Sequence, residues 1–242
     1  MLLLQRLLTY AAEWKAPSLR PVEVWGDAAS AFCEAAGVET AKKAGKTVLI
    51  SDALLRSKAI ELAARVEAGA TAVVSCATKD MLAALSKAFG VAIQAVDLGT
   101  QYNFARAAED PLLEGISNQE TYWLDNACYG PRDSQNRPMA DLLITCKQAE
   151  TLLTSERESC WRELFTLGGW NERLKMAVVT KYLWDGPRKS AAGMVRISHG
   201  KGELIICQVP FRNEDAYARA RTFWVQVLNN ARVRMGKTLL EG

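Results

Sequence analysis

Residues 22–90 alternate between short apolar runs and segments with helical periodicity, and this alternation restricts the fold more than any other feature of the chain. These runs predict strands at 22–25, 47–50 and 72–75. Between the second and third runs, one set of apolar residues follows the i, i+3, i+4, i+7 spacing of a helix face: Ala59, Leu62, Ala63 and Val66. Strands separated by helical segments of about 10–15 residues form right-handed βαβ units, so the pattern predicts a parallel sheet.

Glycines and capping residues mark the ends of these helices. Asp27 is expected to cap a helix that runs through Ala36 and stops at Gly37. The next helix stops at Gly69, and a further helix with Met81, Leu82, Leu85 and Phe89 on its apolar face stops at Gly90. Residues 91–96 are then expected to form a fourth strand.

The second half of the chain is less regular. Residues 99–140 are rich in loop signals such as Asp110-Pro111. Four strands are expected later, at 142–146, 176–180, 193–197 and 204–209, without strong helical patterns between them. The chain is predicted to close with an amphipathic helix over residues 214–233, whose apolar face includes Trp224. These patterns predict an α/β fold, a flavodoxin-like or doubly wound three-layer sandwich with a mostly parallel sheet and an antiparallel extension.

Three segments are expected along the chain. Residues 1–18 contain a helical pattern that resembles residues 223–228 of the closing helix, and they are interpreted as the tail of a preceding domain. Residues 19–235 form the α/β domain, and residues 236–242 form a tail. On this interpretation the chain is a piece of a longer protein.

Composition excludes several classes of partner and site. The net charge of +3 over 242 residues is too small to indicate a nucleic-acid surface, and no apolar run is long enough to span a bilayer. The N-terminal leucines lack the features of a signal peptide, and the compartment is left open. A single histidine and the absence of a Cys-x-x-Cys pair argue against a metal site, and no cofactor is expected. The cysteines are interpreted as mainly buried free thiols: Cys33, Cys76, Cys128, Cys146, Cys160 and Cys207.

Three segments, in this order, carry a resemblance to a known superfamily: 67–74, 110–123 and 200–206. With them, the chain resembles the class I glutamine amidotransferase-like superfamily. More narrowly, it is similar to the catalytically degenerate domains attached to bacterial glycoside hydrolases, including the β-galactosidase trimerisation type. In catalytic members of this superfamily, the strand before the last helix ends in a histidine followed closely by a glutamate. Here that corner, residues 208–214, has Glu214 but no histidine, so the resemblance implies a degenerate site.

Cys76 is the main candidate nucleophile, because it follows an apolar strand and precedes a helix, as a nucleophile elbow requires. Ser75 is the alternative nucleophile, and His199, the only histidine, is the base that either would need. The β-branched residues Val74 and Thr78 flank the elbow where small residues are expected, so the turn is predicted to suit a strained elbow poorly. On this view Cys76 is structural, and His199 is an exposed turn residue.

Ligand candidates lie at strand ends and in the irregular half. Asp52 follows a predicted strand, and Tyr122 and Trp123 offer aromatic faces on which a sugar ring can stack. The chain lacks the length and repeat of a (β/α)8 barrel, so it is not expected to be a glycosidase by itself.

The first hypothesis is therefore a non-catalytic accessory or assembly domain related to carbohydrate-active hydrolases, with a neighbouring domain or a second copy as its partner. One alternative is a hydrolase of an ester, lactone or amide that uses Cys76 or Ser75 with His199. The other is a sugar or small-molecule binding module.

Overall fold

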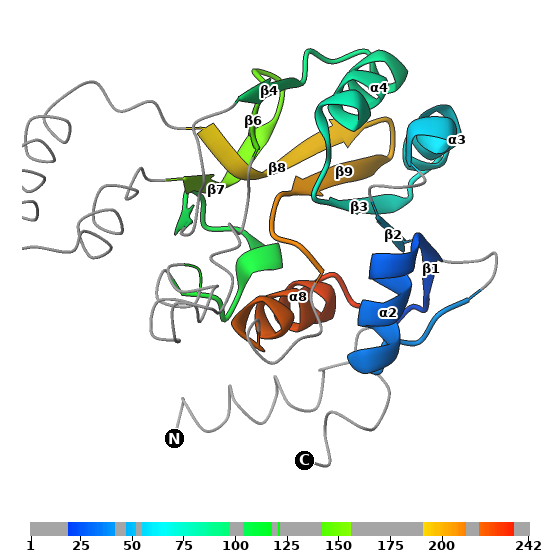
Figure 1. Ribbon diagram of the computed structural model, residues 1–242, viewed down its shortest axis with the longest axis vertical. Helices are drawn as coiled ribbons and strands as arrows, with labels where there is room; N and C mark the ends of the chain where they lie inside the picture. The colour runs from blue at the N-terminus through cyan, green and yellow to red at the C-terminus, as the bar shows by residue number, and fades with distance from the viewer. Residues whose placement is uncertain are drawn as a thin grey trace, which may run out of the picture.

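The computed structural model describes residues 19–41, 47–51, 55–96, 104–117, 121, 142–155, 191–211 and 218–234. These residues form an α/β domain in which one sheet is covered by helices on both faces (Figure 1). The expected helix over residues 1–18, the strand at 176–180 and the tail after residue 235 lie outside the described residues.

The parallel half of the sheet contains four strands in the order β1-β2-β3-β9. Their bounds are Val22–Trp25 for β1, Thr47–Ile50 for β2, Thr71–Ser75 for β3 and Gly202–Cys207 for β9. All side chains of β2 are buried, as are four of the five in β3, because helices cover both faces. This burial on both faces explains why the sequences of β2 and β3 are largely apolar.

The antiparallel half extends from β9. Strand β8 pairs with β9, with β6 and with β7, and the remaining pairs are β4 with β6 and β5 with β7. The bounds are Gln94–Val96 for β4, Ala105–Arg106 for β5, Leu143–Thr145 for β6, Glu150–Ser155 for β7 and Ala191–His199 for β8. A 3-10 helix, η1, spans Pro111–Leu113.

In the part of the chain that the structure describes, two helices lie on each face of the sheet. Helices α2 (Asp27–Ala35) and α8 (Ala218–Asn230) share one core with the inner side chains of β2, β3 and β9. Helices α3 (Leu55–Glu67) and α4 (Lys79–Phe89) share a second core on the other face. Figure 1 shows this division, with α2 and α8 below the sheet and α3 and α4 above it. The predicted flavodoxin-like α/β fold with an antiparallel extension is confirmed.

Two strand assignments differ from expectation. Strand β4 was expected to continue the parallel series after α4, but it lies at the far end of the sheet and pairs antiparallel with β6. Strand β9 was expected in the antiparallel extension, but it lies beside β3 and pairs with it in parallel. Pairing partners depend on contacts between residues far apart in the chain, which periodicity does not report.

The predicted start of the first βα turn is off by one residue. Gly26, with φ 120°, is the residue before α2, and Asp27 is the first helical residue rather than the cap. At the C-terminal end of α4, Gly90 adopts the left-handed conformation, as its position predicts. No helix in the described part of the chain is long and apolar enough to cross a bilayer.

The two ends of the described domain are joined beside β1. Arg20 and Val233 form a parallel bridge, and the amide of Arg234 donates to the Arg20 carbonyl at 2.8 Å. The Glu39 amide donates to the Arg234 carbonyl at 2.9 Å, and the two side chains form an ion pair. The segment after α8 therefore links the start of the domain to the segment that follows α2.

Candidate functional site

The carboxyl ends of the four parallel strands define the candidate site, because ligands of open α/β sheets bind at this edge. In register, Trp25, Ile50, Val74 and Ile206 lie side by side. The residues that follow them line the edge in the same order: Gly26, Ser51, Ser75 and Cys207.

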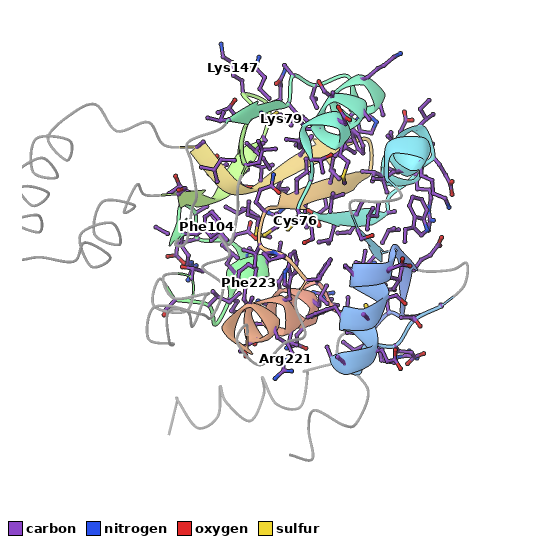
Figure 2. All side chains as sticks on the ribbon, in the orientation of Figure 1. Cys76, Lys79, Phe104, Lys147, Arg221 and Phe223 are labelled. Carbon is purple, nitrogen blue, oxygen red and sulfur yellow. The ribbon has the colours of Figure 1, made fainter. Side chains whose placement is uncertain are left out.

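Cys76 adopts the backbone geometry of a nucleophile elbow. Its φ is 51°, a left-handed conformation that is uncommon for a residue with a Cβ. It follows β3 and precedes α4, and Figure 2 places it at that end of the strand. The prediction that Val74 and Thr78 make the turn unsuited to a strained elbow is therefore wrong. The side chain of Val74 is accommodated in the core beneath α3 and α4, and Thr78 caps α4 by accepting from the Met81 amide.

Two backbone carbonyls at and just after the end of β9 accept hydrogen bonds from Cys76. Its amide donates to the Cys207 carbonyl at 2.9 Å, and its Sγ lies 3.5 Å from the Gln208 carbonyl oxygen. The Gln208 side chain is itself engaged, because its Nε2 donates to the Ala77 carbonyl at 3.1 Å. A carbonyl oxygen accepts a hydrogen bond but is no base for a thiol, so these contacts position the sulfur without activating it.

The Ser75 side chain is buried and hydrogen-bonded within the fold. The residue is 3% exposed, and its Oγ donates to the Val209 carbonyl at 2.8 Å. The hydroxyl therefore holds the segment after β9 against the end of β3.

An aromatic group holds the same segment from the other side. The Trp224 Nε1 donates to the carbonyls of Val209 and Pro210, both at 3.2 Å. The Phe211 ring lies between the rings of Trp224 and Phe32, with centroid distances of 4.4 and 4.9 Å. The segment after β9 is thus held in place by an apolar, hydrogen-bonded packing unit.

His199 lies at the opposite edge of the sheet from Cys76. It is the last residue of β8 and pairs with Gly202 at the start of β9, whereas Ser75 pairs with Cys207 at the end of β9. Five residues of strand separate these two levels, or roughly 16 Å. The imidazole is half-buried and packs edge-on against Phe89, with centroids 4.9 Å apart, rather than lying exposed in a turn as expected.

The structure therefore keeps the proposed catalytic residues apart. Ser75 and Cys76 share the carboxyl edge, but a hydrogen bond from either to His199 is geometrically excluded in this fold. The expected ligand residues Asp52, Tyr122 and Trp123 lie outside the described residues. Within the described ranges, no group of three or more histidine, cysteine, aspartate or glutamate side chains is arranged to hold a metal ion.

A charge cluster that the sequence did not reveal lies on the α8 side of the sheet. The Arg196 guanidinium on β8 binds both carboxylate oxygens of Asp110, with one Nη2 to Oδ1 distance of 2.8 Å. Its Nε lies 3.0 Å from Glu203 Oε2, close enough for an ion pair but without hydrogen-bond alignment. Burial lowers the pKa of Arg196, but the hydrogen bond to Asp110 and the nearby carboxylates raise it overall, so the group remains charged.

Asp110 also organises the loop that carries η1. Its Oδ1 accepts from the Leu112 amide at 2.8 Å, which caps η1. On the other side of the loop, Asn230 of α8 donates to the carbonyls of Leu112 and Glu114 at 2.9 and 2.8 Å. In the sequence, Asp110-Pro111 predicts a turn, but no sequence pattern identifies Arg196 as the partner of Asp110.

The thiols divide into buried and half-buried groups. Cys33 and Cys207 are free and buried, as expected, whereas Cys76 and Cys146 are free and half-buried. Burial raises the pKa of the Cys33 thiol to about 12 and raises that of Cys207 as well. Both core thiols therefore stay protonated and unreactive at neutral pH.

Comparisons with known proteins give a structural likeness but no match in sequence. No protein-family model matches the chain, and no curated protein matches it. Among solved structures, the chain is similar to the cold-adapted β-galactosidase from Rahnella sp. R3, with 14% sequence identity and a TM-score of 0.47. The match covers 96% of this chain and 34% of the β-galactosidase chain, so this chain spans about a third of that protein's length.

Proposed function

We propose that this chain is a non-catalytic accessory or assembly domain related to carbohydrate-active hydrolases. The position of His199 carries the proposal. It is the only histidine of the chain, and it packs on Phe89 at the edge of the sheet opposite to Cys76. A pair of His199 with Cys76 or with Ser75 is therefore out of reach.

The contacts at the carboxyl edge support the same conclusion. The polar side-chain groups of Ser75, Gln208 and Trp224 all donate hydrogen bonds to backbone carbonyls. Such contacts fix the end of β9 and leave no polar side chain of this group to bind or protonate a substrate. The degenerate corner inferred from the sequence is in keeping with this arrangement, and a neighbouring domain or a second copy of the chain is the proposed partner.

A hydrolase of an ester, lactone or amide remains the second candidate because of one observation. The left-handed backbone of Cys76 is the geometry that nucleophile elbows use, and such outliers cluster at functional sites. On this alternative, the base would come from a group other than His199.

A hydrolysis panel on the purified full chain tests the two candidates. Chromogenic esters, lactones and glycosides, together with glutamine, are assayed with wild type, Cys76→Ala, Ser75→Ala and His199→Ala, and circular dichroism checks that each variant is folded. We expect no turnover above a heat-denatured sample. Turnover that disappears in folded Cys76→Ala would overturn the accessory-domain proposal in favour of the hydrolase.

Assembly is tested separately by analytical ultracentrifugation of the chain alone and with a candidate hydrolase. We expect a dimer or higher oligomer, or a stable complex with the hydrolase. A chain that stays monomeric and binds no hydrolase would contradict the assembly role.

A further inference from the structure

The carboxyl ends of β3 and β9 bring two cysteines together. Ser75 and Cys207 are partners in the parallel register, and Cys76 follows Ser75. The Cys76 amide donates to the Cys207 carbonyl at 2.9 Å, so standard bond lengths limit the distance between the two Cα atoms to about 7 Å. Any bend in the hydrogen bond shortens this distance further. Disulfides join Cα atoms that are roughly 4.4–6.8 Å apart, so this pair lies within reach of a bond.

The backbone of Cys76 turns its side chain toward β9. Ser75 and Cys207 share one face of the sheet, and in a continuing strand Cys76 would point to the opposite face. The φ of 51° differs by about half a turn from that of a parallel strand, so it swings the Cα–Cβ bond away from that face. The Cys76 Sγ consequently lies 3.5 Å from the carbonyl oxygen of Gln208, the residue after Cys207.

The two thiols differ in their access to solvent. Cys76 is half-buried, whereas Cys207 is fully buried in the core shared with α2 and α8. Burial raises the pKa of the Cys207 thiol, and the charge of the nearby Cys76 raises it further, so the two sulfur atoms interact. A small oxidant in solution therefore meets Cys76 first, and Cys207 reacts only with a sulfur that already lies beside it.

We propose that Cys76 and Cys207 are a dithiol that a peroxide converts reversibly to a disulfide. The Cys76 sulfur attacks one oxygen of hydrogen peroxide, so an S–O bond forms, the O–O bond breaks, and the leaving hydroxide takes the thiol proton to become water. The Cys207 sulfur then attacks the sulfenic sulfur of Cys76. The S–S bond forms, the S–O bond breaks, and a second water leaves with the Cys207 proton. Two thiols are oxidised and one peroxide is reduced.

This oxidation site does not depend on the proposed function. The disulfide would fasten the end of β3 to the end of β9 and would close a loop that contains more than half of the chain. It requires neither a substrate nor a partner. Its test reads a covalent bond rather than turnover or assembly, so failure of this proposal leaves the proposed function to its own tests.

Peptide mapping of the full chain tests the bond. The protein is treated with hydrogen peroxide at pH 8.5, where thiolate fractions are larger than at neutral pH, and the remaining thiols are blocked with N-ethylmaleimide. Trypsin cleaves after lysine and arginine, which leaves Cys76 in peptide 66–79 and Cys207 in peptide 202–212, each without a second cysteine. We expect mass spectrometry to find these two peptides linked, and the link to be lost after treatment with dithiothreitol.

The order of the two steps is tested with Cys207→Ala. This variant has no thiol at residue 207 to close onto the sulfenic acid of Cys76, so the sulfenic acid should persist and be trapped by dimedone. We expect several-fold more dimedone on peptide 66–79 in Cys207→Ala than in wild type. Circular dichroism checks that the variant is folded, and the peptide map of wild type decides the matter if it is not.

Matched controls come from the other described cysteines. Cys33→Ala removes a buried thiol like that of Cys207, and Cys146→Ala removes a half-buried thiol like that of Cys76. Both variants should form the linked peptides to the same extent as wild type. The proposal is overturned if oxidised wild type lacks the link between peptides 66–79 and 202–212, or if Cys76 is joined to another cysteine instead. It is also overturned if folded Cys207→Ala takes up no more dimedone than wild type.

Discussion

The thiol of Cys76 and the imidazole of His199 lie beside opposite ends of strand β9. Cys76 follows β3 beside the end of β9, and His199 pairs with the residue at which β9 begins. The two side chains are separated by the length of β9 and have different surroundings. The Cys76 thiol contacts a backbone carbonyl, whereas the His199 imidazole packs against the Phe89 ring. Their presence in one chain therefore does not make a catalytic pair.

Replacing Cys76 by glycine should stabilise the domain relative to replacing it by alanine. Alanine keeps the cost of a Cβ in the left-handed conformation, whereas glycine adopts φ 51° without that cost. We expect Cys76→Gly to be more stable than Cys76→Ala by about 1 kcal/mol in urea unfolding. Equal midpoints for the two variants would show that the turn at residue 76 is not left-handed in solution.

Trp224→Ala should destabilise the domain by about 3–5 kcal/mol. The side chain is fully buried, donates to the carbonyls of Val209 and Pro210, and packs against Phe211 and Phe223. Trp224→Phe keeps a ring and loses the donor, so its cost should be clearly smaller. Thermal and urea unfolding of both variants measure the difference, and an unchanged midpoint for Trp224→Ala would contradict the packing described for α8.

Gly193→Ala should destabilise the sheet by about 1–3 kcal/mol through a clash with one ring. A Cβ on Gly193 would lie 2.1 Å from Phe104 Cε1, and Phe104 is 1% exposed, so the ring has little room to move. In a Phe104→Ala background the same substitution should cost almost nothing. A double-mutant cycle measures this coupling, and additive effects would mean that the ring does not lie over Gly193.

Arg196→Leu should cost about 3–5 kcal/mol, because it leaves the buried carboxylate of Asp110 without its partner. Adding Asp110→Asn should recover much of this loss. The amide removes the unpaired charge, and its side-chain oxygen can still accept from the Leu112 amide. Chemical unfolding of the single and double variants provides the comparison. A double variant no more stable than Arg196→Leu alone would argue against an uncompensated charge as the cause.

The buried thiol of Cys33 should make the protein sensitive to alkaline pH. Burial raises its pKa from 9.0 to about 12 in the folded state, so the folded state favours the protonated thiol. The stabilising contribution is therefore fully present below pH 9 and is lost as pH rises toward 12. Wild type and Cys33→Ala are compared by urea unfolding under reducing conditions at pH 8 and pH 11. The stability difference between them should shrink at the higher pH, and a constant difference would show that the thiol is accessible to solvent.

Local periodicity was sufficient to predict the parallel half of the fold. Strands β2 and β3 are largely apolar runs because both of their faces are covered, and α4 ends at Gly90 because a left-handed residue is needed there. The partners of β4 and β9 were not predictable in this way. Both strands are short and apolar, and their neighbours are chosen by contacts more than 40 residues away in the sequence.

The candidate site was predictable by position but not by geometry. Cys76 was identified from its place between a strand and a helix, yet the flanking β-branched residues led to the wrong expectation for its backbone. Val74 points into the core there, away from the turn, so its branched side chain does not crowd the elbow.

The bridge between Arg20 and Val233 brings the two boundaries of the described domain together. The Arg234 Nη2 lies 3.2 Å from the Leu19 carbonyl oxygen, so the two boundaries of the described domain are neighbours in space. A short linker could join these boundaries without crossing the core. New chain ends could then be made at another position on the surface. The same proximity would allow the domain to be placed within a loop of another protein while the two sides of that loop stay close together.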